Sequence, residues 1–209
     1  EEVERWDRFI GNILKILRKK EAHYPQHSRR VMNFAVKICQ LMELDEKYLE
    51  TIPVAALLHD IGKISIGSDI IGKAGPLTEA EYAVVKTHSA LGSDLLRGAG
   101  YLEDIREIIY HHHERWDGDA KSRFPGYPDG VSGEDIPLGA RIIKVADSYE
   151  AMISHRPYSP ARSPEDAIRE LLNEQGRSFD PAVISVFVPY LRTVTGFMSP
   201  EIPPSGRGD

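Results

Sequence analysis

Apolar residues recur three or four positions apart along most of the chain, with polar residues between them. This spacing is typical of helices that bury one face. Two stretches, 64–77 and 115–137, are rich in Gly and Pro and lack this period, so they are predicted to be loops, the second unusually long. We find no convincing strand and no internal repeat. The expected fold class is therefore all-α, a helical bundle with a long Gly/Pro-rich loop.

Residues suited to helix N-caps mark where the helices begin. Thr78 and Glu81 form a capping box, Ser163 precedes Pro164, and Asp180 precedes Pro181. Ser28 is expected to cap the helix that follows His27. Asp45 is expected to cap a short helix, and Pro53 to start or kink the next one, which ends at His59 and Asp60.

The chain divides into three predicted parts. Residues 1–20 have the spacing of an amphipathic helix, which either packs on the domain or connects it to an upstream domain. Residues 21–193 form the main domain. Residues 194–209 are rich in Pro, Gly and Ser and are expected to be a frayed tail.

Composition narrows the possible functions. With 41% hydrophobic and 28% charged residues among 209, the chain reads as an ordinary globular protein. Its net charge of −6 argues against binding polymeric nucleic acid or an anionic membrane. A small phosphorylated substrate stays possible, because bound metal ions invert the local field. A single cysteine, Cys39, excludes an internal disulfide and a cysteine-based zinc site.

The chain contains no signal peptide and no run of about 18 apolar residues, which favours a cytoplasmic location without membrane contact. It begins at Glu1 rather than Met, so we expect a fragment of a longer protein.

Candidate chemistry begins at the adjacent His59 and Asp60, which follow an apolar run. An imidazole and a carboxylate both suit a divalent transition metal. The two oxygens of Asp60 can bridge two ions about 3.5–4 Å apart, as in two-metal phosphoryl-transfer sites. Gly62 is expected to end the helix and let the backbone turn, which would bring Lys63 within reach of a bound anion.

Further candidate ligands lie at helix ends or on buried faces. His112 and His113 follow Ile108 and Ile109 by four residues and so continue a buried stripe, whereas His111 points elsewhere. Each candidate alone is more often structural, but their joint occurrence favours a site for two six-coordinate ions. The full set is His27, His59, Asp60, His88, His112, His113 and Asp147.

The order of these residues resembles the HD superfamily of metal-dependent phosphohydrolases. The resemblance covers about residues 21–191 and narrows to HD-GYP domains through further motifs. These motifs are His59-Asp-Ile-Gly-Lys63, His112-His-Glu114, Asp117-Gly118, Gly126-Tyr-Pro128, Val145-Ala-Asp147 and Arg156-Pro-Tyr158.

The resemblance implies an HD-type helical bundle that hydrolyses the bacterial second messenger cyclic di-GMP. It implies that Asp60 bridges two metal ions, often iron or manganese, with nickel, zinc and magnesium as other candidates. Lys63 would contact the phosphate or donate a proton. Arg156 suits a bidentate phosphate contact. The Gly126-Tyr127-Pro128 loop would shape the mouth of the site, with Tyr127 either stacking on a guanine or serving as a packing anchor.

The sequence departs from the family pattern in three places. Seven residues, Asp119 to Pro125, separate Asp117-Gly118 from Gly126-Tyr127-Pro128, where the family usually has one. Ser159 stands where the family usually has a cation. His23 stands four residues before His27, where family members with three metals carry a Glu, and Pro25 disfavours a helix that continues through both histidines. The presence of a third metal therefore stays open.

The main hypothesis is hydrolysis of cyclic di-GMP to the linear dinucleotide pGpG, with GMP as a further product. One alternative is a phosphohydrolase for another dinucleotide, such as cGAMP or pGpG. Another is a signalling or binding module with weak catalysis, which the full ligand set argues against. An upstream sensor domain and a second copy of the chain are the expected protein partners.

Overall fold

The computed structural model of the chain describes residues 11–12, 15–17, 19, 24–73, 75–98, 102–155 and 160–196. Within these ranges all regular elements are helical, apart from an isolated bridge between Gln175 and Phe179, as the periodicity predicts. No helix in these ranges is both long and apolar enough to cross a bilayer. The helices are α2 (Tyr24–Leu41), α3 (Glu46–Leu58), η1 (Ile61–Ser65), α4 (Ser68–Ile71), α5 (Glu79–Lys86), α6 (His88–Leu95), α7 (Glu103–His111), η3 (Gly133–Asp135), α8 (Leu138–Ile153), α9 (Pro164–Asn173) and α10 (Pro181–Thr195).

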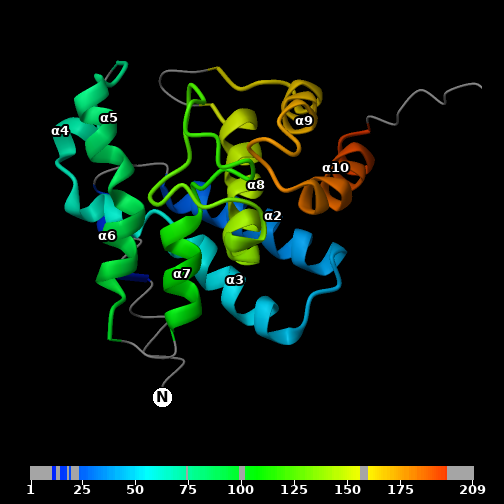
Figure 1. The fold of residues 1–209 in the computed structure, drawn as a ribbon, viewed down its shortest axis with the longest axis horizontal. Coiled ribbons are helices and arrows are strands. Elements are labelled where there is room, and N and C mark those ends of the chain that lie inside the picture. The colour runs from blue at the N-terminus through cyan, green and yellow to red at the C-terminus, as the bar shows by residue number, and fades with distance from the viewer. Residues whose placement is uncertain are drawn as a thin grey trace, which may run out of the picture.

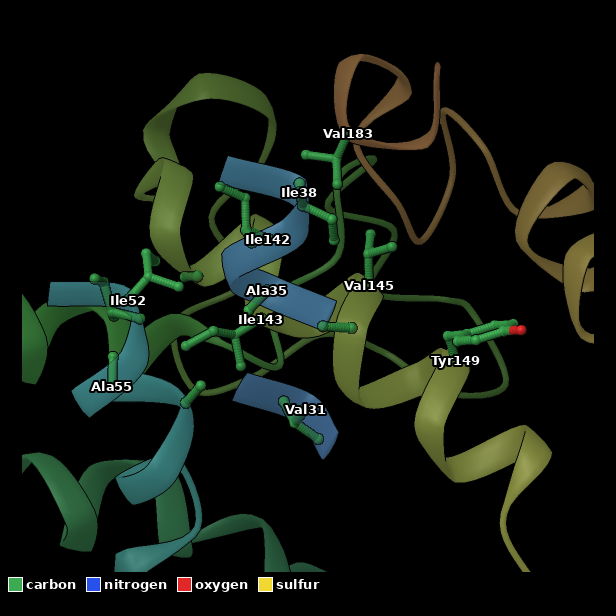
Figure 2. Packing of buried hydrophobic residues seen from close by; sticks show 14 of the residues in the cluster. Val31, Ala35, Ile38, Ile52, Ala55, Ile142, Ile143, Val145, Tyr149 and Val183 are labelled. Atoms are coloured by element: carbon green, nitrogen blue, oxygen red, sulfur yellow. The ribbon is translucent and has the colours of Figure 1, made fainter. Parts of the chain in front are cut away.

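Helix α8 lies at the centre of the bundle. It contacts α2, α3, α7, α9 and α10, and in Figure 1 it stands between the pair α5 and α6 and the pair α9 and α10. Its apolar residues occupy more than one face, which suits a helix surrounded by others. Figure 2 shows the shared core through Ala35 and Ile38 of α2, Ile52 and Ala55 of α3, and Ile142 and Ile143 of α8.

The predicted helix starts are largely confirmed. Asp45, Ser163 and Asp180 each accept a hydrogen bond from a backbone N–H in the first turn of the helix that follows. Thr78 and Glu81 form the expected capping box at the start of α5. These caps satisfy backbone donors that the helix itself leaves unpaired.

The start of α2 differs from the prediction. This helix begins at Tyr24, so Ser28 is buried inside it and does not cap it. Pro25 occupies the first turn, where a missing N–H breaks no helical hydrogen bond. His27 consequently lies one turn into a helix and projects from a fixed position.

Other boundaries also differ. Pro53 lies inside the single helix α3, which Asp45 caps, so the two helices predicted there are one. The predicted loop 64–77 contains the end of η1 and the short helix α4. Helix α10 continues to Thr195, past the expected start of the tail at residue 194, and ends at Gly196 in the left-handed conformation. The described residues of segment 11–19 are helical, and Leu17 is buried.

Gly62 has a different role from the predicted helix end. It lies inside η1, and a Cβ atom added to it would come within 1.9 Å of the His88 carbonyl oxygen and 2.6 Å of the Gly92 nitrogen. Only glycine permits this approach between η1 and α6. Gly62 thereby places the backbone of His88 against the segment that carries Asp60.

We predict that Gly62→Ala lowers the free energy of unfolding by about 1–3 kcal/mol, because the added methyl group meets backbone that cannot rotate away. Urea unfolding followed by circular dichroism measures the change. Gly11→Ala is the matched control, because a Cβ at Gly11 meets nothing within 4 Å. A Gly62→Ala protein as stable as the parent would contradict the close approach.

Candidate active site

A cavity of about 330 Å³ opens between helices α2, α5, α6 and α8 and the loop 115–137. Its lining combines candidate metal ligands and two lysines with aromatic and apolar side chains. The lining residues are His27, Asp60, Lys63, Tyr82, Val85, His88, His113, Phe124, Pro125, Tyr127, Lys144 and Asp147.

Three of the predicted ligand histidines are oriented by the same device. Each follows the end of a helix, and its Nδ1 lies 2.6–2.8 Å from the backbone carbonyl oxygen three residues earlier. A carbonyl only accepts, so Nδ1 carries the proton and Nε2 keeps a lone pair for a metal. The pairs are His59 with Ala56, His88 with Val85, and His112 with Ile109.

Asp60 is the point where these imidazoles meet. His88 Nε2 lies 3.1 Å from Asp60 Oδ1, and Lys63 Nζ lies 2.8 Å from Oδ2. His59 Nε2 lies 3.3 Å from Oδ2; it is buried and has no hydrogen-bond partner among the described residues. Burial opposes ionisation of Asp60, but the charges of Lys63 and His59 more than offset it and hold the pKa of this carboxyl well below its usual range.

The ligand atoms form two clusters that share Asp60. One cluster contains Asp60, His88, His112 and His113, the other His27, His59 and Asp60, and within each the atoms lie no more than 4.8 Å apart. Asp147 Oδ1 lies 3.3 Å from His27 Nε2, beside the second cluster. The structure thus brings all seven predicted ligands together, and His111 lies outside both clusters, near Glu107 and Glu114.

The electrostatics of the clusters fit divalent cations. Burial and neighbouring histidines lower the pKa of His112 and of His113 well below the usual value, so both are neutral, the form that binds metal. Burial alone would lower the pKa of His59, but the charges of Asp60 and Asp147 raise it to about 9. A metal cation bound at His59 would take the place of the proton on its imidazole and neutralise the negative charge of these two carboxylates. The orphaned His59 Nε2 and this donor set therefore suit a metal.

Glu150 is a site residue that the sequence analysis missed. Its Oε2 accepts a hydrogen bond from His27 Nδ1 at 2.5 Å, and its Oε1 accepts from Arg30 Nε at 2.7 Å and Ser154 Oγ at 2.6 Å. Burial raises the pKa of Glu150, but these partners more than offset it and lower it to about 2. Its position three residues after Asp147, on the same face of α8, was the available signal.

Glu114 holds the loop that carries the Gly126-Tyr127-Pro128 motif. Its buried carboxylate accepts backbone N–H groups of Asp129 at 2.7 Å and of Gly130 at 3.1 Å. Gly126 packs so closely that an added Cβ would lie 2.6 Å from the Arg115 nitrogen. These contacts fix the loop at the mouth of the cavity.

Within the motif, only Tyr127 lines the cavity. Its ring stacks on His113 with centroids 4.7 Å apart, so one ring face serves as a packing anchor. Gly126 and Pro128 are not lining residues and act through the shape of the loop. The peptide bond between Tyr127 and Pro128 is cis.

Lys144 is a second residue that the sequence analysis missed. It lines the cavity from α8, and its Nζ donates to the His113 carbonyl oxygen at 3.1 Å. Burial lowers the pKa of Lys144 to about 8. No carboxylate lies within salt-bridge distance of it in the described part of the chain. The sequence signal was a lysine inside an apolar run, three residues before Asp147.

Several predicted residues lie outside the described ranges. Arg156, the expected phosphate contact, and Ser159 belong to the segment 156–159, and His23 precedes the start of α2. Their roles stay predictions.

Comparisons with known proteins relate this chain to an HD domain family model and to phosphodiesterases named for cyclic dinucleotides. A family model described as HD domain matches residues 13–183. A cyclic di-GMP phosphodiesterase of Thermotoga maritima is 37% identical over 188 residues, which cover 89% of this chain and 49% of the relative. A 3'3'-cGAMP-specific phosphodiesterase 2 of Vibrio cholerae is 29% identical over 181 residues, which cover 86% of this chain and 34% of the relative. The chain thus spans half or less of these relatives' lengths.

A solved structure shares the fold. The cyclic GMP-AMP specific phosphodiesterase V-cGAP3 of V. cholerae superposes with a TM-score of 0.64 at 20% identity. The match covers 93% of this chain and 51% of that one.

We predict that Asp60→Ala removes metal from both clusters, because this carboxylate belongs to each. Elemental analysis after loading with Mn²⁺ or Fe²⁺ measures the loss. Circular dichroism should stay helical, since packing holds the helices. Asp104→Ala, which removes an exposed carboxylate paired with Lys47, is the control and should keep the parent metal content. Near-parent metal content in Asp60→Ala would exclude the shared-ligand arrangement.

Proposed function

This chain belongs to the HD domain family, and from that premise we propose that it is a metal-dependent phosphodiesterase that hydrolyses cyclic di-GMP to pGpG. The expected HD-type all-α bundle is confirmed. The observation that carries the proposal is a carboxylate, Asp60, common to two ligand clusters in a cavity that also contains two lysines. The name of the T. maritima relative supports the choice of substrate.

The proposed cofactors are two divalent metal ions, iron or manganese. When bound, two such ions activate water and neutralise the phosphoryl oxygens in the transition state. His88, His112 and His113 would hold one ion, and His27 and His59 the other, with Asp60 shared and Asp147 beside the second. The described carboxylates and histidines form these two clusters, and each cluster would hold one of the two proposed ions.

The chain's own residues prepare the site for this chemistry. Backbone carbonyls and Glu150 fix the imidazoles before any ligand arrives, which lowers the cost of organising them. Lys63 Nζ lies beside Asp60 and can contact a phosphoryl oxygen or give its proton to the leaving oxygen. Lys144 supplies a second cation on the cavity wall, from α8. Arg156 stays a proposed phosphate ligand.

A second candidate substrate is cGAMP, which the name of the V. cholerae relative supports, and pGpG is a third. The same candidate metal ligands would serve all three substrates. The values of kcat/KM for cyclic di-GMP, cGAMP and pGpG therefore decide which one is the preferred substrate. A binding module without catalysis would bind a dinucleotide and release no product. The cytoplasmic location, the upstream sensor domain and the homodimer stay predictions.

We predict that the metal-loaded chain converts cyclic di-GMP to pGpG, which accumulates before GMP appears. With two metals, the second cleavage is slower because the new terminal phosphate has no ion to neutralise it. A chromatographic time course together with elemental analysis measures both quantities. Three metals per chain, or GMP without a pGpG lag, would contradict the two-metal proposal, and removal of metal with a chelator should abolish turnover.

We predict that Lys144→Gln raises KM for cyclic di-GMP about 10- to 150-fold, because one charge-assisted phosphate contact is lost. Metal content should stay at the parent value, because the hydrogen bond that Lys144 donates near the clusters goes to a backbone carbonyl and not to a candidate ligand side chain. Lys47→Gln, on an exposed lysine that does not line this cavity, is the matched control. Unchanged KM in Lys144→Gln would show that this lysine only supports the His113 backbone.

A further inference from the structure

The seven residues Asp119 to Pro125, which stand where the family usually has one, place an aromatic ring at the cavity. Phe124 is 62% exposed, the highest value among the large apolar side chains that the structure describes as exposed, and it lines the cavity together with Pro125. The loop is shaped by its own side chains: Asp119 Oδ1 accepts from Lys121 N at 2.9 Å, and Ser122 Oγ accepts from Phe124 N at 3.3 Å. The ring is therefore presented by a folded turn and is not packed into the core.

Helix α5 contributes another aromatic residue to the cavity lining. Tyr82 is 39% exposed and lines the cavity with Val85. Neither Phe124 nor Tyr82 stacks on another ring within the described part of the chain. Their recorded ring contacts are with cations of adjacent or nearby residues: Arg123 lies 5.2 Å from the Phe124 centroid, and Lys86 Nζ lies 5.4 Å from the Tyr82 centroid. Both rings are thus exposed residues of the cavity lining that a ligand can contact.

The cavity lining therefore combines two kinds of side chain. Metal ligands with Lys63 and Lys144 suit a charged phosphodiester, whereas Phe124, Tyr82 and Val85 suit an uncharged planar group. A cyclic dinucleotide carries both kinds of group, since each phosphodiester is flanked by nucleosides with planar bases. Every base has a π-face that stacks on an aromatic side chain.

We propose that Phe124 stacks on one purine base of the bound cyclic dinucleotide, with Tyr82 of α5 as the second aromatic contact. The inserted segment is then a substrate-binding wall that determines affinity for the nucleoside portion. This inference rests on the proposed phosphodiesterase function. It assigns a role to the insertion that distinguishes this chain from the family pattern.

The first test is the steady-state kinetics of Phe124→Ala in the metal-loaded chain. Loss of one base–aromatic contact should raise KM for cyclic di-GMP about 5- to 150-fold, with kcat within about twofold of the parent value. Phe124→Trp should keep the parent KM, because an indole also stacks. Phe124→Leu retains an apolar side chain without a π-face and should behave like Phe124→Ala.

Val194→Ala is the matched control, because Val194 is 58% exposed on α10 and is not a lining residue. It should leave KM unchanged. Tyr82→Ala should raise KM and Tyr82→Phe should not. A parent-like KM in Phe124→Ala, or in Phe124→Leu, would overturn the stacking proposal.

A binding measurement separates this inference from the function on which it rests. Titrating metal-loaded Phe124→Trp with a hydrolysis-resistant phosphorothioate analogue of cyclic di-GMP should quench the new indole, because a guanine stacks on it. Saturable binding without quenching would overturn the inference alone. If the parent chain neither binds the analogue nor hydrolyses cyclic di-GMP, the proposed function fails as well.

Discussion

The carboxylate of Asp60 imposes the constraint on which the rest of the site depends. It is buried and ionised, so it requires positive or polar partners from several directions. Lys63 supplies one partner from the same segment, but His88 and His112 come from helices far along the chain. Helices α3, α6 and α7 must therefore begin or end around a single point. The bundle achieves this by packing α3 and α7 against α8, and α6 against α7 and η1.

Carbonyl groups near the helix ends both gain hydrogen-bond partners and orient the histidine side chains of the site. The last carbonyls of a helix lack intrahelical partners. Near the ends of α3, α5 and α7, such a carbonyl accepts from the Nδ1 of a candidate ligand histidine, which satisfies the carbonyl and fixes the imidazole. Gly62 completes the geometry because the absence of a side chain allows η1 to reach the backbone of His88. The way in which the helices end therefore sets the orientation of these histidine side chains.

Much of this could be predicted from the sequence, because the signals are local. Periodic apolar residues and cap residues such as Thr78 and Asp180 act within one or two turns, so they determined the helices and most of their boundaries. The candidate ligand set was recognisable because histidines and aspartates at helix ends or on buried faces need partners. The exceptions were also local in origin: Pro25 is compatible with a first helical turn, and the prediction treated it as a break.

Only the tertiary structure decided which distant residues complete the site. Glu150 reaches His27 across 123 positions, and Lys144 reaches His113 across 31, and no pattern within one helix encodes either pairing. The insertion was visible in the sequence, but the position of Phe124 at the cavity depends on how the loop folds against α5 and α8. The sequence by itself therefore determined which helices form and which side chains are candidate metal ligands. Packing decided which atoms meet, because contacts across the bundle depend on the relative placement of whole helices.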